Sequence, residues 1–409
     1  MKIQKINKKI NSIKKKESKF PNNEIEYVLD VLDTENKKKA YVYELEKKIS
    51  KLFNVKYAIA CNSGTSGLHA CVAALNLNQN DEVIVPSLAV VMDAYAVIHC
   101  RAKPVFADVE TNSMLVTAET IKRKITKKTK AIILVSLQGL PVDIDPIIKI
   151  AKKNKIKIIE DNAQEFFGRY KNKVAGVAGD MSIWSFENKK HLSGATEGGI
   201  ITTNNKNYAE KLRKFCGIGY INLKSDSNIN PLPLSKIQDP NYLRFDFIGL
   251  NYRMPEIVGA VCLGQLENFR KIVSRRIKVA NIFNKEINKC EWLIPQKANH
   301  SYKHTYYSFA VRYLGNEKLG RSWKQFYNDY TTMGGDGFYA GCYPIYKEPS
   351  ILKYFNRKKY NKVFCKNAEI VQQQIIQFKT NYRNLEDAKK NANILSKLII
   401  KYNNLYNEK

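Results

Sequence analysis

Strand and helix patterns alternate along residues 57–161, and this alternation limits the possible fold more than any other feature. Apolar runs typical of buried strands lie at residues 57–60, 81–86, 104–108, 131–135 and 156–161. Helical patterns lie between them, for example at 68–75 and 143–153. Strands joined to helices over a few residues predict an α/β fold with a mostly parallel sheet covered by helices. In such sheets, ligands bind outside the carboxyl ends of the strands.

Three polar points fall at or near this edge. The small-residue turn 61–67 joins a strand to a helix, where free N–H groups and hydroxyls can bind an anion. Asp161 ends a strand, and Lys190 lies in a turn between apolar runs. A buried lysine can have the lowered pKa that imine formation needs. Each point alone also fits an ordinary turn or a solvated strand end.

Together, the three points match the reactive groups of pyridoxal phosphate. The turn takes the phosphate, the carboxylate of Asp161 keeps the ring nitrogen protonated, and Lys190 forms an imine with the aldehyde. The lysine would also move a proton between the substrate carbon and the cofactor carbon. The sequence therefore predicts a pyridoxal phosphate site.

Seven short motifs, in the same order, resemble the DegT/DnrJ/StrS family of sugar aminotransferases, within the aspartate aminotransferase fold type. The resemblance runs from about Pro21 to Pro349. The motifs are residues 62–69, 81–87, 139–146 and 160–164, Ser185-Phe186 with Lys190, Glu197-Gly198-Gly199, and residues 251–254. Lys189 is an alternative reactive lysine, but the spacing of four from Phe186 selects Lys190.

The resemblance implies a pyridoxal-phosphate-dependent transferase of fold type I. It implies a large domain with a seven-stranded, mostly parallel sheet flanked by helices, and a smaller C-terminal α+β domain. We expect a basic leader at 1–18, the large domain at 19–255 and the small domain at 256–409.

The resemblance also implies a role for each site residue. Lys190 holds the cofactor aldehyde, Asp161 pairs with the ring nitrogen and Gln164 faces the ring hydroxyl. The phosphate would be bound by Gly64, Thr65, Ser66 and Ser185. Asn251 would reach the phosphate in the neighbouring subunit, which implies a homodimer with shared sites, although Asn251 could also cap a turn. His191 is more simply a structural histidine than a proton shuttle.

The expected activity is transfer of an amino group, from glutamate, to a keto-sugar used in lipopolysaccharide, other cell-surface polysaccharides or amino sugars. The alternative substrate is an oxidised eight-carbon acid, a 3-deoxy-octulosonate, in place of a nucleotide-linked 4-keto-6-deoxyhexose. Sugar dehydratases of the family replace the lysine with histidine, so Lys190 argues against that activity. Two departures bear on the substrate: Val90 stands near where the family has an aromatic residue, and residues 333–344 are unusually Gly-rich.

The net charge of +30 raises the alternative of a nucleic-acid-binding regulator on the same scaffold. Because lysines are spread through every segment and Asn and Ile are also abundant, we favour a general compositional bias, and we expect no nucleic acid partner. The leader could lie on a membrane surface, but we expect no stable insertion. The eight cysteines lack metal-ligand spacing, so no metal is expected, and the cytoplasm is the expected location.

Overall fold

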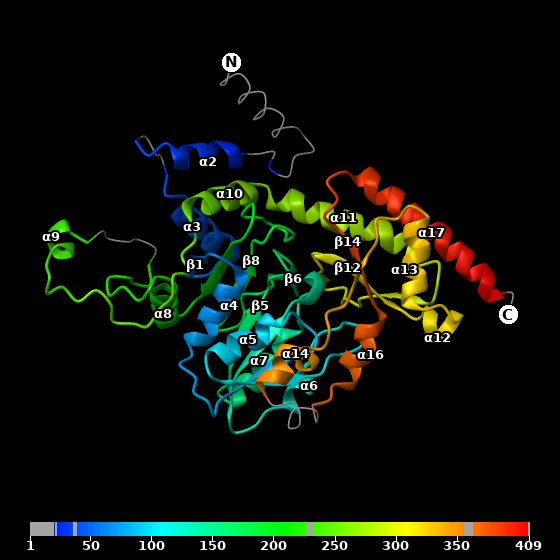
Figure 1. The fold of residues 1–409 in the computed structure, drawn as a ribbon, viewed down its shortest axis with the longest axis horizontal. Helices are drawn as coiled ribbons and strands as arrows, with labels where there is room; N and C mark the ends of the chain where they lie inside the picture. The colour runs from blue at the N-terminus through cyan, green and yellow to red at the C-terminus, as the bar shows by residue number, and fades with distance from the viewer. Residues whose placement is uncertain (1–19, 21–22, 36–38, 227–231, 356–362, 408–409) are drawn as a thin grey trace, which may run out of the picture.

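The computed structural model describes residues 20, 23–35, 39–226, 232–355 and 363–407 (Figure 1). The predicted basic leader at 1–18 lies outside these residues. Among the described residues, no helix combines the length and the apolar character that crossing a bilayer requires.

A seven-stranded sheet forms the larger part of the molecule. Its strands follow in the order β1 (Tyr57–Cys61), β9 (Gly199–Thr203), β8 (Met181–Ser185), β5 (Lys157–Asp161), β4 (Thr129–Val135), β2 (Glu82–Pro86) and β3 (Lys103–Ala107). Strand β9 is antiparallel to both of its neighbours, and the other pairings are parallel. The expected α/β fold with a mostly parallel seven-stranded sheet is confirmed.

Both faces of this sheet are buried, which explains why its strands read as continuous apolar runs. On one face, Ile59 and Ile183 belong to a core that includes residues of helices α4 (Gly64–Ala73), α5 (Met92–His99), α7 (Ile144–Lys153) and α8 (Lys206–Cys216). On the other face, Ala60 and Trp184 belong to a core with α3 (Tyr41–Phe53) and α10 (Glu256–Glu267). In β1, β8 and β9, successive residues thus serve opposite cores, as the pleat requires.

A second sheet of four antiparallel strands lies beside the first (Figure 1). Its order is β10 (Leu293–Pro295), β12 (Ser308–Tyr313), β14 (Ile375–Lys379) and β13 (Tyr339–Ala340). It shares an aromatic-rich core with α11 (Phe269–Ile287), α13 (Trp323–Thr332) and α17 (Leu385–Asn407). The boundary between domains at residues 255 and 256 stays a prediction.

The remaining elements are short. A three-stranded sheet joins β11 (Tyr302–Lys303), β6 (Arg169–Tyr170) and β7 (Lys173–Val174). The other helices are α2 (Glu24–Leu32), α6 (Ala118–Lys122), η1 (Leu137–Gly139), α9 (Leu234–Ile237), α12 (Gly315–Leu319), η2 (Ile345–Lys347), α14 (Pro349–Tyr354) and α16 (Lys366–Gln374). Figure 1 shows that the segment carrying α9 extends away from the two sheets.

Candidate active site

Strands β1, β5 and β8 run in the same direction, so their carboxyl ends meet at one edge of the large sheet. A cavity of about 310 Å³ lies behind the lysine turn, and a second one of about 230 Å³ opens at this edge. The second cavity is lined by six of the eight predicted site residues: Gly64, Thr65, Asp161, Gln164, Ser185 and Lys190. The fold thus brings together residues far apart in the sequence.

The turn before α4 forms an anion cradle. The Ser63 hydroxyl caps the helix by accepting a hydrogen bond from the Ser66 N–H over 3.0 Å. The first N–H groups of a helix have no partner within it, and the helix dipole adds positive potential there. A Cβ on Gly64 would lie only 2.7 Å from Cβ of Ser185, so glycine is required where the helix start meets β8. The cavity lies against this helix start.

Ser66 takes a different place from the one predicted. Its hydroxyl lies 2.8 Å from the Ser63 hydroxyl, and its side chain is buried and does not line the cavity. Ser66 therefore stabilises the capped turn, while Thr65 and Ser185 are the hydroxyl residues that line the cavity.

Asp161 is the last residue of β5, and Gln164 lies in the turn that follows it. The Asp161 carboxylate accepts a hydrogen bond from the Ala163 N–H over 2.8 Å, which fixes its direction. Burial raises the pKa of Asp161, and this N–H and the nearby Lys190 amine oppose the rise. The Gln164 carbonyl oxygen accepts the Gln138 N–H over 2.7 Å, so the rest of its amide group can donate.

Lys190 is held between buried groups. Its amine lies 4.6 Å from the centre of the Tyr307 ring. Burial lowers the pKa of Lys190, and the charge of Asp161 partly opposes this. A lysine in this setting is neutral more often than an exposed one, which is the condition for attack on an aldehyde. The neighbouring His191 is buried, with Nε2 2.9 Å from the carbonyl oxygen of Thr305, and it does not line this cavity.

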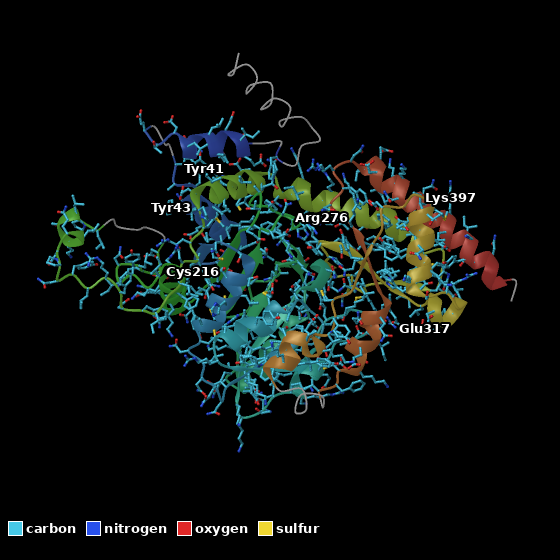
Figure 2. The ribbon with its side chains drawn as sticks, viewed as in Figure 1. Tyr41, Tyr43, Cys216, Arg276, Glu317 and Lys397 are labelled. Carbon is cyan, nitrogen blue, oxygen red and sulfur yellow. The ribbon has the colours of Figure 1, made fainter. Side chains whose placement is uncertain are left out.

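Arg276 anchors the lysine turn from the opposite side. It lies on α11, near the middle of the molecule (Figure 2), and is buried. Its guanidinium donates to the carbonyl oxygens of Lys189 and Lys190, over 2.7 Å and 2.9 Å. It also donates to the carbonyl oxygen of Tyr307 and the hydroxyl of Thr380, over 2.8 Å and 3.1 Å. One side chain thus ties the lysine turn to the small sheet.

Asn251 does not line the cavity. It is exposed and forms an isolated bridge with Gly217. Within one chain, the structure therefore separates it from the other predicted residues, and its part in a neighbouring subunit stays a prediction.

Several lining residues were not predicted as site residues. They are Leu68, Val90, Met92, Asp93, Val135, Ala163, Ile183, Glu187 and Glu197. For Asp93, a signal was available, because it is an acid within the apolar helical run 89–98, although the first turn of a helix is also a place that suits an acid. Arg276 gave no such signal, because basic residues occur throughout this chain.

The groups in this cavity fit pyridoxal phosphate: a helix start for a phosphate, a fixed carboxylate for a ring nitrogen and a buried amine for an aldehyde. The Gly64 position matters for this fit, since a Cβ there would collide with Ser185, which lines the same cavity. Among the described residues, no group of three or more His, Cys, Asp or Glu side chains is placed to hold a metal ion.

Comparisons with known proteins agree with this geometry. Residues 19–393 match the model of the DegT/DnrJ/EryC1/StrS aminotransferase family. A GDP-perosamine synthase of Escherichia coli O157:H7 is 33% identical over 290 residues, which are 70% of this chain and 74% of that protein.

Two solved structures share the fold. An aminotransferase from Psychrobacter cryohalolentis superposes with a TM-score of 0.82 at 23% identity, over 93% of this chain and 97% of that one. The GDP-4-keto-6-deoxymannose-3-dehydratase ColD, solved as a mutant with bound GDP-perosamine, has a TM-score of 0.75 at 25% identity, over 91% and 97%. The chain therefore belongs to the DegT/DnrJ/EryC1/StrS aminotransferase family and is a sugar aminotransferase that depends on pyridoxal phosphate.

Proposed function

We propose that this enzyme transfers an amino group from glutamate to a nucleotide-linked keto-sugar, with Lys190 as its catalytic residue. The observation that carries the proposal is the shared cavity of Lys190, Asp161 and the start of α4. Similarity to a GDP-perosamine synthase favours a nucleotide-linked 4-keto-6-deoxyhexose over the eight-carbon acid.

Bound pyridoxal phosphate supplies an aldehyde that carries the amino group and a ring that takes up electrons from the substrate carbon. Asp161 accepts a hydrogen bond from the ring nitrogen, and the Gln164 amide donates to the ring hydroxyl. The start of α4, with Thr65 and Ser185, binds the phosphate. The Lys190 amine would form the covalent link to the aldehyde and would act as the base that moves a proton at the substrate carbon.

The Gly-rich stretch 333–344 supports a sugar site beside the lysine turn. Its Tyr339 is 64% exposed on β13, and the Lys189 amine lies 5.9 Å from the centre of its ring. Cys342, in the same stretch, is exposed and lies close enough to Lys190 for the lysine charge to act on it. We propose that this stretch contacts the sugar, while the phosphate cradle at α4 holds the cofactor.

We also propose a homodimer with shared sites. The segment before Asn251 exposes apolar side chains, including Ile248 (95% exposed) and Leu243 (77% exposed). Exposed apolar residues gathered on one segment are typical of an interaction surface. Asn251 lies at the end of this segment, where a second copy would receive it next to its own cavity.

The covalent bond to Lys190 tests the proposal directly. Purified protein loaded with cofactor is reduced with borohydride, digested and examined by mass spectrometry. We expect the cofactor on Lys190, and we expect Lys190→Ala to carry none. Lys189→Ala is the matched control, since it removes the adjacent amine and leaves the backbone carbonyl that Arg276 binds. Reduced cofactor retained by Lys190→Ala would refute the assignment.

The substrate is tested on the same preparation. Glutamate should change the absorbance of the cofactor bound to the wild-type enzyme. The loaded enzyme is then given GDP-4-keto-6-deoxymannose or an oxidised 3-deoxy-octulosonate, and the product mass is measured. An amino sugar from the first supports the proposal. Amination of the octulosonate alone would overturn the nucleotide-linked substrate, and a deoxy product without nitrogen would indicate a dehydratase.

A further inference from the structure

Asp93 is an acid where an acid is costly. It is the second residue of α5, it is 1% exposed, and its buried neighbours along the helix are Ala94, Ala96 and Val97. It lines the cavity that contains Asp161 and Lys190. Its Oδ1 atom has no hydrogen-bond partner among the described residues. A buried polar atom without a partner needs an explanation, because its desolvation is unfavourable.

The carboxyl groups of Asp93 and Asp161 lie within hydrogen-bonding reach of each other. Two buried carboxyl groups that interact in this way share a proton, because ionising both in a low-dielectric site is costly. The charged or titratable groups that act on the pair from other elements are the Lys190 amine of the lysine turn and the Cys71 thiol of α4.

The surroundings of the two groups decide which one holds the proton. Asp161 accepts the Ala163 N–H over 2.8 Å, which stabilises its ionised form. Burial, and then the charge of Asp161, raise the pKa of Asp93 well above its usual range. On Asp161, the Ala163 N–H, Lys190 and Asp93 all oppose the rise in pKa that burial causes. These surroundings favour the proton on Asp93 and the charge on Asp161.

We propose that Asp93 is a positioning residue, which donates its proton as a hydrogen bond to Asp161 and so holds that carboxylate ionised and directed at the ring nitrogen of the cofactor. This inference rests on the proposed role of Asp161. Asp93 thereby fixes both the strength with which Asp161 attracts the ring proton and the orientation of the cofactor.

Two variants separate this role from a merely structural one. Asp93→Asn keeps the shape and an N–H donor toward Asp161, whereas Asp93→Leu keeps a similar size and loses the donor. Apoenzyme of each is first checked for wild-type secondary structure by circular dichroism. Each is then titrated with pyridoxal phosphate to obtain the dissociation constant, and the absorbance of the bound cofactor is followed against pH.

We expect Asp93→Leu to weaken cofactor binding by about tenfold or more, since a hydrogen bond to a charged group is lost. Its absorbance midpoint on the pH scale should move, while Asp93→Asn stays close to wild type in both measurements. If Asp93→Asn and Asp93→Leu weaken cofactor binding and move the absorbance midpoint equally, the negative charge of Asp93 matters rather than its proton, and the proposal is wrong.

If both variants match wild type in cofactor affinity and in the pH midpoint of absorbance, Asp93 only fills volume in the core, and the proposal is also wrong. A wild-type protein that binds no cofactor is a different result, because it would instead remove the proposed function. The two failures are therefore distinguishable in one experiment.

Discussion

The guanidinium of Arg276 donates a hydrogen bond to the carbonyl oxygen of Lys190 over 2.9 Å. The same group also binds Lys189, Tyr307 and Thr380, and no carboxylate among the described residues forms an ion pair with it. Burial lowers the pKa of Arg276 to about 10, so the guanidinium remains charged at neutral pH. Four neutral oxygens and the Tyr307 ring, whose centre lies 5.8 Å from the guanidinium carbon, surround this buried cation, and two of the oxygens belong to the lysine turn.

Replacing Arg276 should loosen that turn. We expect Arg276→Ala to lower the free energy of unfolding by about 3 kcal/mol, since it leaves buried carbonyl groups without donors. Arg276→Lys keeps the charge but loses the planar group of donors, so its free energy of unfolding should lie between those of wild type and Arg276→Ala. Urea denaturation measures the stability, and borohydride trapping measures how much cofactor reaches Lys190. Unchanged values for Arg276→Ala would contradict an anchoring role.

Gly64 should be essential for the cradle. In Gly64→Ala, the new Cβ would lie 2.7 Å from Cβ of Ser185, so α4 and β8 must separate. We expect weaker cofactor binding by about tenfold and lower stability. Gly67→Ala is the matched control, because its Cβ would meet Cys61 and Ile201 away from the cavity. It should cost stability alone, and an equal loss of cofactor affinity in both variants would contradict the assignment.

His304 should make the protein less stable in mild acid. Burial lowers its pKa to about 3, with Nε2 3.1 Å from the side-chain oxygen of Gln296. Between the folded and the unfolded pKa of this histidine, the unfolded chain binds a proton and the folded chain does not. The histidine therefore contributes its full stability above its unfolded pKa, and this contribution falls as the pH drops toward its folded pKa. Burial also lowers the pKa of His191, which acts in the same direction.

The loss attributable to His304 between about pH 7.5 and about pH 5.5 should be about 1 kcal/mol. Urea denaturation at the two pH values, in wild type and His304→Gln, measures it. The difference in unfolding free energy between the two pH values, and not the stability at either one, is the quantity compared between the two proteins. An equal pH dependence in both proteins would show that His304 is not responsible.

An aromatic ring at Val90 should improve cofactor binding. Val90 lines the cavity and is 42% exposed, so there is room for a larger side chain. Stacking of Phe on the cofactor ring should add about 0.5–1.5 kcal/mol, a gain of several-fold in affinity. The rate of cofactor release from Val90→Phe is the measurement. Val90→Leu adds bulk without a ring, and a similar gain in both would show that stacking is not the cause.

Shared sites predict that two inactive variants restore each other. When Lys190→Ala and Asn251→Ala subunits are unfolded and refolded together, half of the dimers are mixed, and each mixed dimer has one intact site. We expect about a quarter of wild-type activity from the mixture. Size-exclusion chromatography with light scattering confirms the dimer. Activity no greater than the sum of the separate variants would refute the shared site.

The sequence predicted the large sheet well, because its strands are short apolar runs whose period differs clearly from that of the helices between them. It also predicted the residues of the lysine turn and the end of β5. It did not predict β14 or β13, because Ile375–Lys379 and Tyr339–Ala340 become strands only by pairing with each other and, for β14, with β12. Such pairing depends on long-range contacts rather than local pattern.

The side chains that support the site were the least predictable. Ser66 carries a hydroxyl of the kind that binds phosphate, yet this hydroxyl forms a hydrogen bond with the hydroxyl of Ser63. Arg276 is one basic residue among many and gains its role only when α11 reaches the lysine turn. The interaction of Asp93 with Asp161 joins the first turn of α5 to the end of β5, which are far apart in the sequence. Tertiary geometry, and not residue type, assigns these roles.

The reversed direction of β9 has a mechanical consequence. Ser185 and Gly199 are paired across β8 and β9, so the segment 186–198, which carries the Lys190 amine, is a loop that is closed at its base by the paired strands. Because the two strands are paired along their length, a shift of one strand moves both ends of the segment together. Arg276 on α11 joins this segment to the residues that precede β12, and the hydrogen bond of His191 to the Thr305 carbonyl oxygen joins it to the same stretch, so a tilt of the smaller sheet would be passed to the amine.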